Sequence, residues 1–127
     1  MHWSFLCLLF SGLLPVVGAG IAKAGLRDFD NHAPREWLAR QSGYRARANA
    51  AQANSFEAFP LFAAAVLLAL QAGVAQSTLD TLAIAFVLAR LAYIASYLAD
   101  RATLRSLCWF IGHGCAVALF VLALQAA

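Results

Sequence analysis

The chain has 127 residues, of which 63% are hydrophobic and only 12% are charged. This balance is too apolar for an ordinary soluble domain, and the length allows one compact unit. The net charge is +3, and the basic residues cluster between apolar segments instead of forming a stripe with interleaved aromatics. The composition therefore predicts a membrane protein and argues against a nucleic-acid partner.

Four apolar segments predict four transmembrane helices. The first is uncharged from Met1 to Ala22, and about 20 such residues cross a hydrocarbon core. It is long enough to span, and no Lys or Arg precedes it, so we do not expect a cleaved signal peptide. The fold class predicted is all-α, an integral membrane four-helix bundle formed by a single domain, 1–127, with helices at about 2–23, 44–72, 78–99 and 104–126.

The connections between these segments carry local signals. Residues 25–43 form the long polar loop, in which Pro34 is expected to start a short interfacial helix anchored by Trp37. After the second apolar segment, Ser77 is predicted as the N-cap of the third helix, with Asp80 in the acidic place of a capping box.

Cysteines and histidines offer little specific chemistry. Cys7, Cys108 and Cys115 lie in apolar segments without metal-ligand spacing, so they are predicted as small buried hydrophobes, and no metal site is expected. His32 is interpreted as a solvated loop residue, with a ligand or base as the alternative. His113, between two glycines, is interpreted as a packing residue, with proton handling as the alternative.

The second segment carries a polar stripe. On a helix, Arg47, Asn54 and Glu57 fall within a sector of roughly 80°. Because an ionised carboxylate inside a bilayer is costly unless it is paired, Glu57 is expected to point into the bundle and meet a cation there. Pro60, one turn further along, removes a helical amide and is expected to kink the helix or free a carbonyl.

The third segment carries one charge near its middle. Arg90, Tyr93 and Tyr97 share a helix face within about 60°. An arginine at this depth needs a partner such as Glu57 and indicates a functional site. The tyrosines alone would be read as packing or interfacial aromatics.

Two separated patterns in this order resemble the MAPEG family, the membrane-associated proteins of eicosanoid and glutathione metabolism. The first runs Arg47-Ala48, then Asn54-x-x-Glu57, then Pro60-Leu61-Phe62. The second is Arg90-x-x-Tyr93-x-x-x-Tyr97 followed by Arg105-Ser106. The resemblance covers essentially the whole chain and suggests a bacterial-type member similar to microsomal glutathione transferases. The chain departs from the family at Ala50, where many members carry a second arginine.

The resemblance implies a glutathione-dependent membrane enzyme that conjugates the thiolate to apolar electrophiles or reduces lipid hydroperoxides arriving from the bilayer. It implies that Arg105 and Ser106 hold the sulfur as a thiolate while Tyr97 binds the peptide portion or assists. The remaining residues of the expected glutathione site are Arg47, Asn54, Glu57, Arg90 and Tyr93. Arginine forks suit the two carboxylates of glutathione, and a cation lowers the pKa of a thiol. The family also implies a homotrimer with the site between neighbours.

The distribution of basic residues predicts the topology. Lys and Arg surround the first and third connections, and the second connection has none. By the positive-inside rule the first and third loops are cytoplasmic and both termini face outward, as expected for a protein of the bacterial inner membrane.

Two other function classes remain open at this point. One is a non-catalytic lipid- or glutathione-binding scaffold of the same fold, which the loss of an arginine at Ala50 favours. The other is a small proton-coupled transporter with Glu57 as the titrating group, for which the surrounding arginines are unfavourable. The sequence does not distinguish transferase, peroxidase and isomerase activity, nor does it identify the electrophile.

Overall fold

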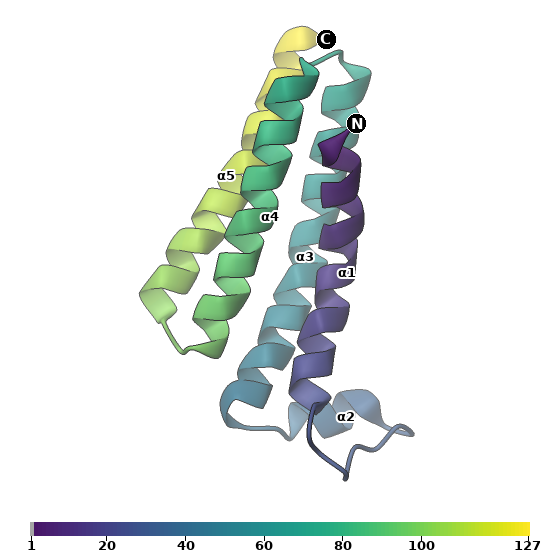
Figure 1. Ribbon diagram of the computed structural model, residues 1–127, viewed down its shortest axis with the longest axis vertical. Coiled ribbons are helices and arrows are strands. Elements are labelled where there is room, and N and C mark those ends of the chain that lie inside the picture. The colour runs from purple at the N-terminus through teal and green to yellow at the C-terminus, as the bar shows by residue number, and fades with distance from the viewer. Residues whose placement is uncertain (1) are drawn as a thin grey trace.

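Helices make up almost the whole of the computed structural model, which describes residues 2–127 (Figure 1). The elements, in ranges close to those expected, are α1 (Trp3–Lys23), α2 (Pro34–Ala39), α3 (Gly43–Gln71), α4 (Gln76–Leu98) and α5 (Ala102–Ala126). Four of them are long and apolar enough to cross a membrane. The all-α expectation is confirmed, and the chain is an integral membrane protein.

The long helices run up and down as two pairs. Figure 1 shows α1 beside α3 and α4 beside α5, with both termini and the α3–α4 connection at one end of the bundle. The short helix α2 and the α4–α5 connection lie toward the other end, where the two pairs diverge. This opposite end carries most of the basic residues of the chain, and we call it the basic end.

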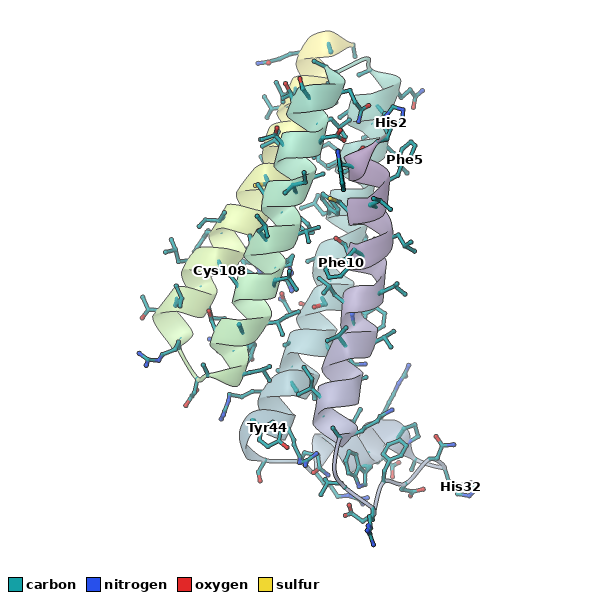
Figure 2. The ribbon with its side chains drawn as sticks, viewed as in Figure 1. His2, Phe5, Phe10, His32, Tyr44 and Cys108 are labelled. Atoms are coloured by element: carbon teal, nitrogen blue, oxygen red, sulfur yellow. The ribbon has the colours of Figure 1, made fainter. Side chains whose placement is uncertain are left out.

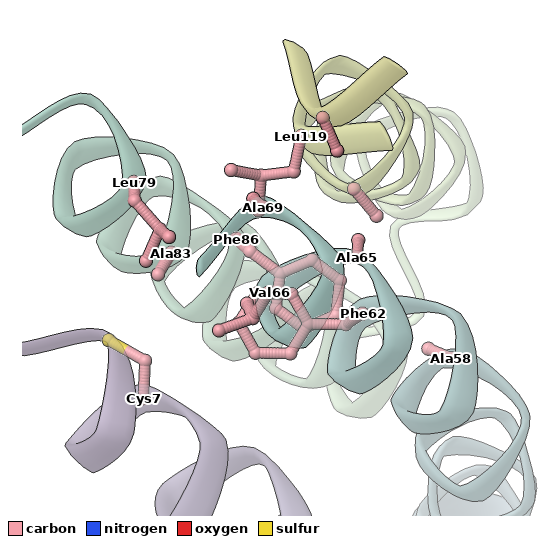
Figure 3. Packing of buried hydrophobic residues seen from close by; sticks show 12 residues of the cluster. Cys7, Ala58, Phe62, Ala65, Val66, Ala69, Leu79, Ala83, Phe86 and Leu119 are labelled. Atoms are coloured by element: carbon pink, nitrogen blue, oxygen red, sulfur yellow. The ribbon is translucent and has the colours of Figure 1, made fainter. Parts of the chain in front are cut away.

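Small side chains bring the helices together in the bundle core. Fully buried alanines line the inner faces of α3 and α4, and the rings of Phe62 and Phe86 stack between these helices with centroids 3.8 Å apart (Figure 3). On α1 the buried Gly18 lies against α3 so closely that a Cβ atom there would stand 3.0 Å from Gln52 Cβ. Membrane helices associate through such small-residue contacts because lipid gives no hydrophobic drive between them.

Large apolar side chains cover the outside of the bundle. Leu9 and Val16 of α1 are 62% and 65% exposed, and Phe110 of α5 is 67% exposed. Figure 2 shows Phe5 on the outer face of α1. An exposed apolar surface of this extent is expected where lipid replaces water as the solvent.

The interfacial helix α2 forms as expected and packs on the basic end. Trp37 and Leu38 are buried in one cluster with Ala22 and Ala48. Phe29, from the loop before α2, meets the Trp37 ring edge-on at 5.0 Å. The helix therefore joins the ends of α1 and α3.

The predicted cap of α4 is wrong. The helix begins at Gln76 with Ala75 as its N-cap, so Ser77 already lies inside it. Asp80 Oδ1 instead accepts a hydrogen bond from the backbone N–H of Ser4, at 2.8 Å, and one from Gln76 Nε2, at 2.7 Å. The carboxylate satisfies a free amide in the first turn of α1, because that amide has no partner within its own helix.

Candidate active site

A tight turn between α4 and α5 sets the position of Arg105. Asp100 has a φ of 57°, and the N–H of Arg101 donates to the carbonyl of Ser96 at 2.9 Å, the pattern of a Schellman cap. The chain reverses within this turn, so α5 runs back along α4. Arg105, in the first turns of α5, thereby comes to lie over the Tyr97 ring, 4.4 Å from its centroid.

A hollow of about 240 Å³ opens between three helices beside this turn. One lining residue comes from α3, one from α4 and the rest from α5. They are Asn54, Tyr93, Arg105, Ser106, Trp109 and Phe110. The structure thus brings together four of the eight site residues expected from the sequence and adds two aromatic residues to them.

Arg90 does not line the hollow itself but is buried next to Tyr93, which does. Its side chain is 1% exposed, and its guanidinium lies 4.2 Å from the centroid of the Tyr93 ring. Nη2 donates a hydrogen bond to Ser55 Oγ at 3.3 Å, whereas Nη1 has no partner. A buried cation satisfied mainly by a hydroxyl and an aromatic face retains a strong field for a nearby anion.

The rings connect the two cations. Tyr93 and Tyr97 meet edge to face at 5.7 Å, so Arg90, Tyr93, Tyr97 and Arg105 form one continuous series, which we call the cation–aromatic row. It runs from the buried Arg90 to Arg105, which lines the hollow. The shared face predicted for α4 is therefore real, and the α4–α5 turn adds Arg105 to it.

Glu57 does not occupy the place expected for it. Its side chain is exposed on the outside of the chain instead of pointing into the bundle, and Oε2 accepts a hydrogen bond from Asn54 Nδ2 at 3.3 Å. The interior beside it is filled by small residues, and Arg90 reaches Ser55 instead. Asn54 Oδ1, in the hollow, is buried without a hydrogen-bond partner.

Arg47 lies apart from the hollow and stabilises a helix end. Its Nε and Nη2 donate to the carbonyl of Leu98, at 3.3 Å and 3.1 Å. Arg45 does the same for α1, donating from Nη1 to the carbonyl of Ala22 at 3.0 Å. The last carbonyls of a helix lack intrahelical partners and carry the negative end of its dipole, so both arginines satisfy neighbouring helix ends.

Sequence reasoning missed Trp109 and Phe110, although their spacing contains a signal. They follow Arg105 and Ser106 by four positions each, which places them one turn further along the same face of α5. Trp109 stacks on His113 at 3.8 Å, and His113 Nδ1 lies 3.2 Å from the Trp109 carbonyl oxygen. His113 therefore supports the indole.

The other candidate ligands lie outside the hollow. His32 is exposed on the loop before α2, at the basic end (Figure 2), where its backbone N–H donates to Asp30 Oδ1 at 2.9 Å. Cys108 is buried in α5, and Cys7 in α1. Among residues 2–127, no group of three His, Cys, Asp or Glu side chains could hold a metal ion.

Comparison with protein families gives a match over nearly the whole chain, because residues 3–125 fit the MAPEG family. The chain belongs to this family. MAPEG proteins include glutathione-dependent membrane enzymes, commonly bind glutathione and typically form trimers. Comparison with curated proteins gives no match.

Proposed function

We propose that this MAPEG protein is a glutathione-dependent membrane enzyme that conjugates glutathione to apolar electrophiles or uses it to reduce lipid hydroperoxides. The observation that carries the proposal is the hollow, in which Arg105 and Ser106 meet Asn54 and Tyr93 at the end of the cation–aromatic row.

The free polar atoms suit a peptide with carboxylates and N–H groups. Asn54 Oδ1 is a buried acceptor without a donor, and Arg90 Nη1 is a buried donor without an acceptor. An unsatisfied buried polar atom costs free energy that a ligand can recover. Glutathione carries two carboxylates, an ammonium and two amide N–H groups, which supply both kinds of partner.

In this proposal Arg105 and Ser106 are the catalytic residues. The guanidinium of Arg105 and the positive end of the α5 dipole favour the thiolate over the thiol, and the Ser106 hydroxyl donates a hydrogen bond to the sulfur. The bound thiolate supplies the nucleophile. Tyr97 holds Arg105 by its ring, while Tyr93, Asn54 and Arg90 orient the peptide. Arg47, bonded to Leu98, would have to leave that contact to bind glutathione.

We further propose a homotrimer in which Glu57 faces a neighbouring subunit. Glu57 is exposed on a helix at membrane depth, where an unpaired carboxylate is costly, so a cation or a glutathione ammonium beside it would relieve that cost. Chemical crosslinking in mild detergent tests this arrangement. Trimer bands support it, and monomer alone refutes it.

Calorimetric titration of glutathione into the detergent-solubilised protein tests the site. Arg105→Ala should weaken binding by about 10- to 100-fold, the range for a hydrogen bond to a charged group. Glu57→Gln should weaken it also, if the carboxylate binds the ammonium of glutathione. Arg101→Ala is the matched control, because Arg101 is exposed in the same turn and does not line the hollow. Equal affinities for Arg105→Ala and Arg101→Ala would contradict the assignment.

The second candidate is a non-catalytic scaffold of the same fold that binds lipid or glutathione. It is favoured by Ala50, which provides no cation where many relatives have an arginine. Glutathione binding without turnover of electrophiles or hydroperoxides would support it. A proton-coupled transporter is less well supported, since Glu57 accepts a hydrogen bond from Asn54, which lines a hollow that also contains Arg105.

For the topology we propose that the basic end faces the cytoplasm of a bacterial inner membrane, following the positive-inside rule. Single cysteines at His32 and Ser77, in a background without Cys7, Cys108 and Cys115, report the two ends. A membrane-impermeant maleimide should label the Ser77→Cys variant in intact cells and the His32→Cys variant only after lysis. The reverse pattern would refute the orientation.

A further inference from the structure

We infer that Arg47 is a positioning residue that acts through the end of α4, holding the α4–α5 turn that places Arg105 at the hollow. This inference rests on the proposed function, because the effect expected is on the thiolate held at Arg105. It gives Arg47 a different role from that of a glutathione ligand, the role expected from the sequence.

Arg47 completes the C-terminal end of α4. The last four carbonyls of a helix have no amide partners within it and need donors from elsewhere. Three of those of α4 accept the amides that follow, from Ala99 at 3.0 Å, Asp100 at 3.1 Å and Arg101 at 2.9 Å. The fourth, the carbonyl of Leu98, accepts from Nε and Nη2 of Arg47, at 3.3 Å and 3.1 Å. A side chain of α3 therefore supplies what the turn itself does not.

This contact lies where the two helix pairs separate. Figure 1 shows the α1–α3 pair and the α4–α5 pair diverging toward the basic end. Arg47 belongs to α3 and Leu98 to α4, so their hydrogen bonds join one pair to the other. The side chain of Leu98 also packs against the cluster that contains Trp37. Because apolar packing is non-directional, the two hydrogen bonds give the end of α4 its orientation.

Arg105 depends on this end of α4 at two points. Tyr97, whose ring centroid lies 4.4 Å from the Arg105 guanidinium, directly precedes Leu98 in the chain. The N–H of Arg105 donates to the carbonyl of Arg101 at 2.9 Å, so α5 starts from the same turn. A shift of Leu98 would therefore move both the ring and the helix that carry the guanidinium. A displacement of about 1 Å can reduce the rate of a reaction that depends on orientation by about 100-fold.

The position of Arg47 favours this indirect role over direct binding. Arg47 does not line the hollow, and the α3 residue that does, Asn54, lies about two helical turns further along. Two of its nitrogen atoms already donate to the carbonyl of Leu98. A carboxylate of glutathione would have to displace those bonds and leave the end of α4 without its donor.

The test separates the ionisation of the bound thiol from the affinity for the peptide. The pH dependence of thiolate absorbance gives the thiol pKa of glutathione bound to the detergent-solubilised protein. Calorimetry with S-methylglutathione gives an affinity that does not involve the thiol. Arg47→Met, which removes the donors and keeps an unbranched stem, should raise the thiol pKa and leave the affinity for S-methylglutathione unchanged. The rise should be smaller than in Arg105→Ala, for which the loss of a nearby cation predicts about 1–3 pH units.

Arg45→Met is the matched control. Arg45 also donates to a carbonyl at a helix end, that of Ala22 at 3.0 Å, but this end belongs to α1 and does not lead into the α4–α5 turn. The thiol pKa should therefore keep its wild-type value in Arg45→Met. Arg47→Lys, which keeps a charged donor, should restore most of the wild-type pKa.

A direct ligand would give the opposite result. Arg47→Met would then weaken the binding of S-methylglutathione by about 10- to 100-fold and leave the thiol pKa unchanged, and this outcome would overturn the inference. Equal thiol pKa values in Arg47→Met and Arg45→Met would overturn it as well. Neither result would remove the proposed function, because glutathione would still be bound.

If the wild-type protein does not bind glutathione, the proposed function fails, and amide hydrogen exchange tests the positioning by itself. The N–H of Arg101, bonded to the carbonyl of Ser96, reports whether the turn is closed. Faster exchange of this amide in Arg47→Met than in Arg45→Met would support the inference, and equal exchange would overturn it. If Arg47→Met does not fold, Arg47→Lys and Arg45→Lys provide the same comparison.

Discussion

The contact between α1 and α3 at Gly18 predicts a specific difference between two glycines of one helix. A Cβ atom at Gly18 would lie 3.0 Å from Gln52 Cβ and 3.2 Å from the Ala48 carbonyl oxygen, whereas at Gly20 nothing lies within 4 Å. The atoms that Gly18→Ala would meet belong mainly to the α3 backbone, so a rotamer change cannot relieve the clash. The helices must move apart along their contact.

The size of the expected change in stability for each variant follows from two opposing effects. Replacing a glycine inside a helix by alanine stabilises the helix by about 0.5–1 kcal/mol. Overpacking a close contact costs about 1–3 kcal/mol. Gly20→Ala should therefore match or exceed the stability of the wild-type protein, while Gly18→Ala should fall below Gly20→Ala by about 1–3 kcal/mol.

Reversible unfolding in mixed micelles, followed by circular dichroism, measures the difference between the two variants. Both carry the same substitution in the same helix, so the gain in helix propensity cancels. Equal stabilities would refute the close approach of α1 and α3. A Gly18→Ala protein that is more stable than Gly20→Ala would show that the two helices lie further apart than described.

Three further predictions concern the helix ends, and thermal unfolding in detergent measures each of them. Asp80→Ala should destabilise the protein by about 1–2 kcal/mol because the Ser4 amide loses its cap, and Asp80→Asn, which keeps an acceptor, should cost less. Arg47→Ala should cost about 1.5–3 kcal/mol, because the carbonyl of Leu98 loses a charged donor; full stability would contradict a role for Arg47 at this helix end. Asp100→Gly should stabilise the protein by about 1 kcal/mol, since glycine adopts the positive φ of the α4–α5 turn without strain, and a loss of stability would argue against this backbone geometry.

Much of the fold was predictable because hydrophobicity and helical periodicity are local properties. The four apolar segments indicate the four long helices, and the spacing of Arg90, Tyr93 and Tyr97 indicates a shared face. The proline-initiated helix at Pro34 is also a local signal. Each of these depends on residues within one element, and the structure has them as expected.

The errors arise where one element meets another. Asp80 carries a helix-start pattern, yet its carboxylate satisfies an amide of α1, and nothing within the α4 sequence reveals that neighbour. Glu57 and Arg90 were expected to pair because each needs a partner, but the packing of α3 on α4 gives Arg90 the hydroxyl of Ser55 instead. Trp109 was overlooked because an aromatic residue in an apolar helix resembles an ordinary lipid-facing side chain.

The bond between Asp80 and Ser4 also constrains the order of assembly. It joins residues 76 positions apart, so the first turn of α1 has no cap when that helix first enters the membrane. The cap forms only after two more segments have been synthesised and α4 lies beside α1. During biosynthesis the first turn of α1 therefore stays uncapped until the third membrane span, α4, has been inserted beside it.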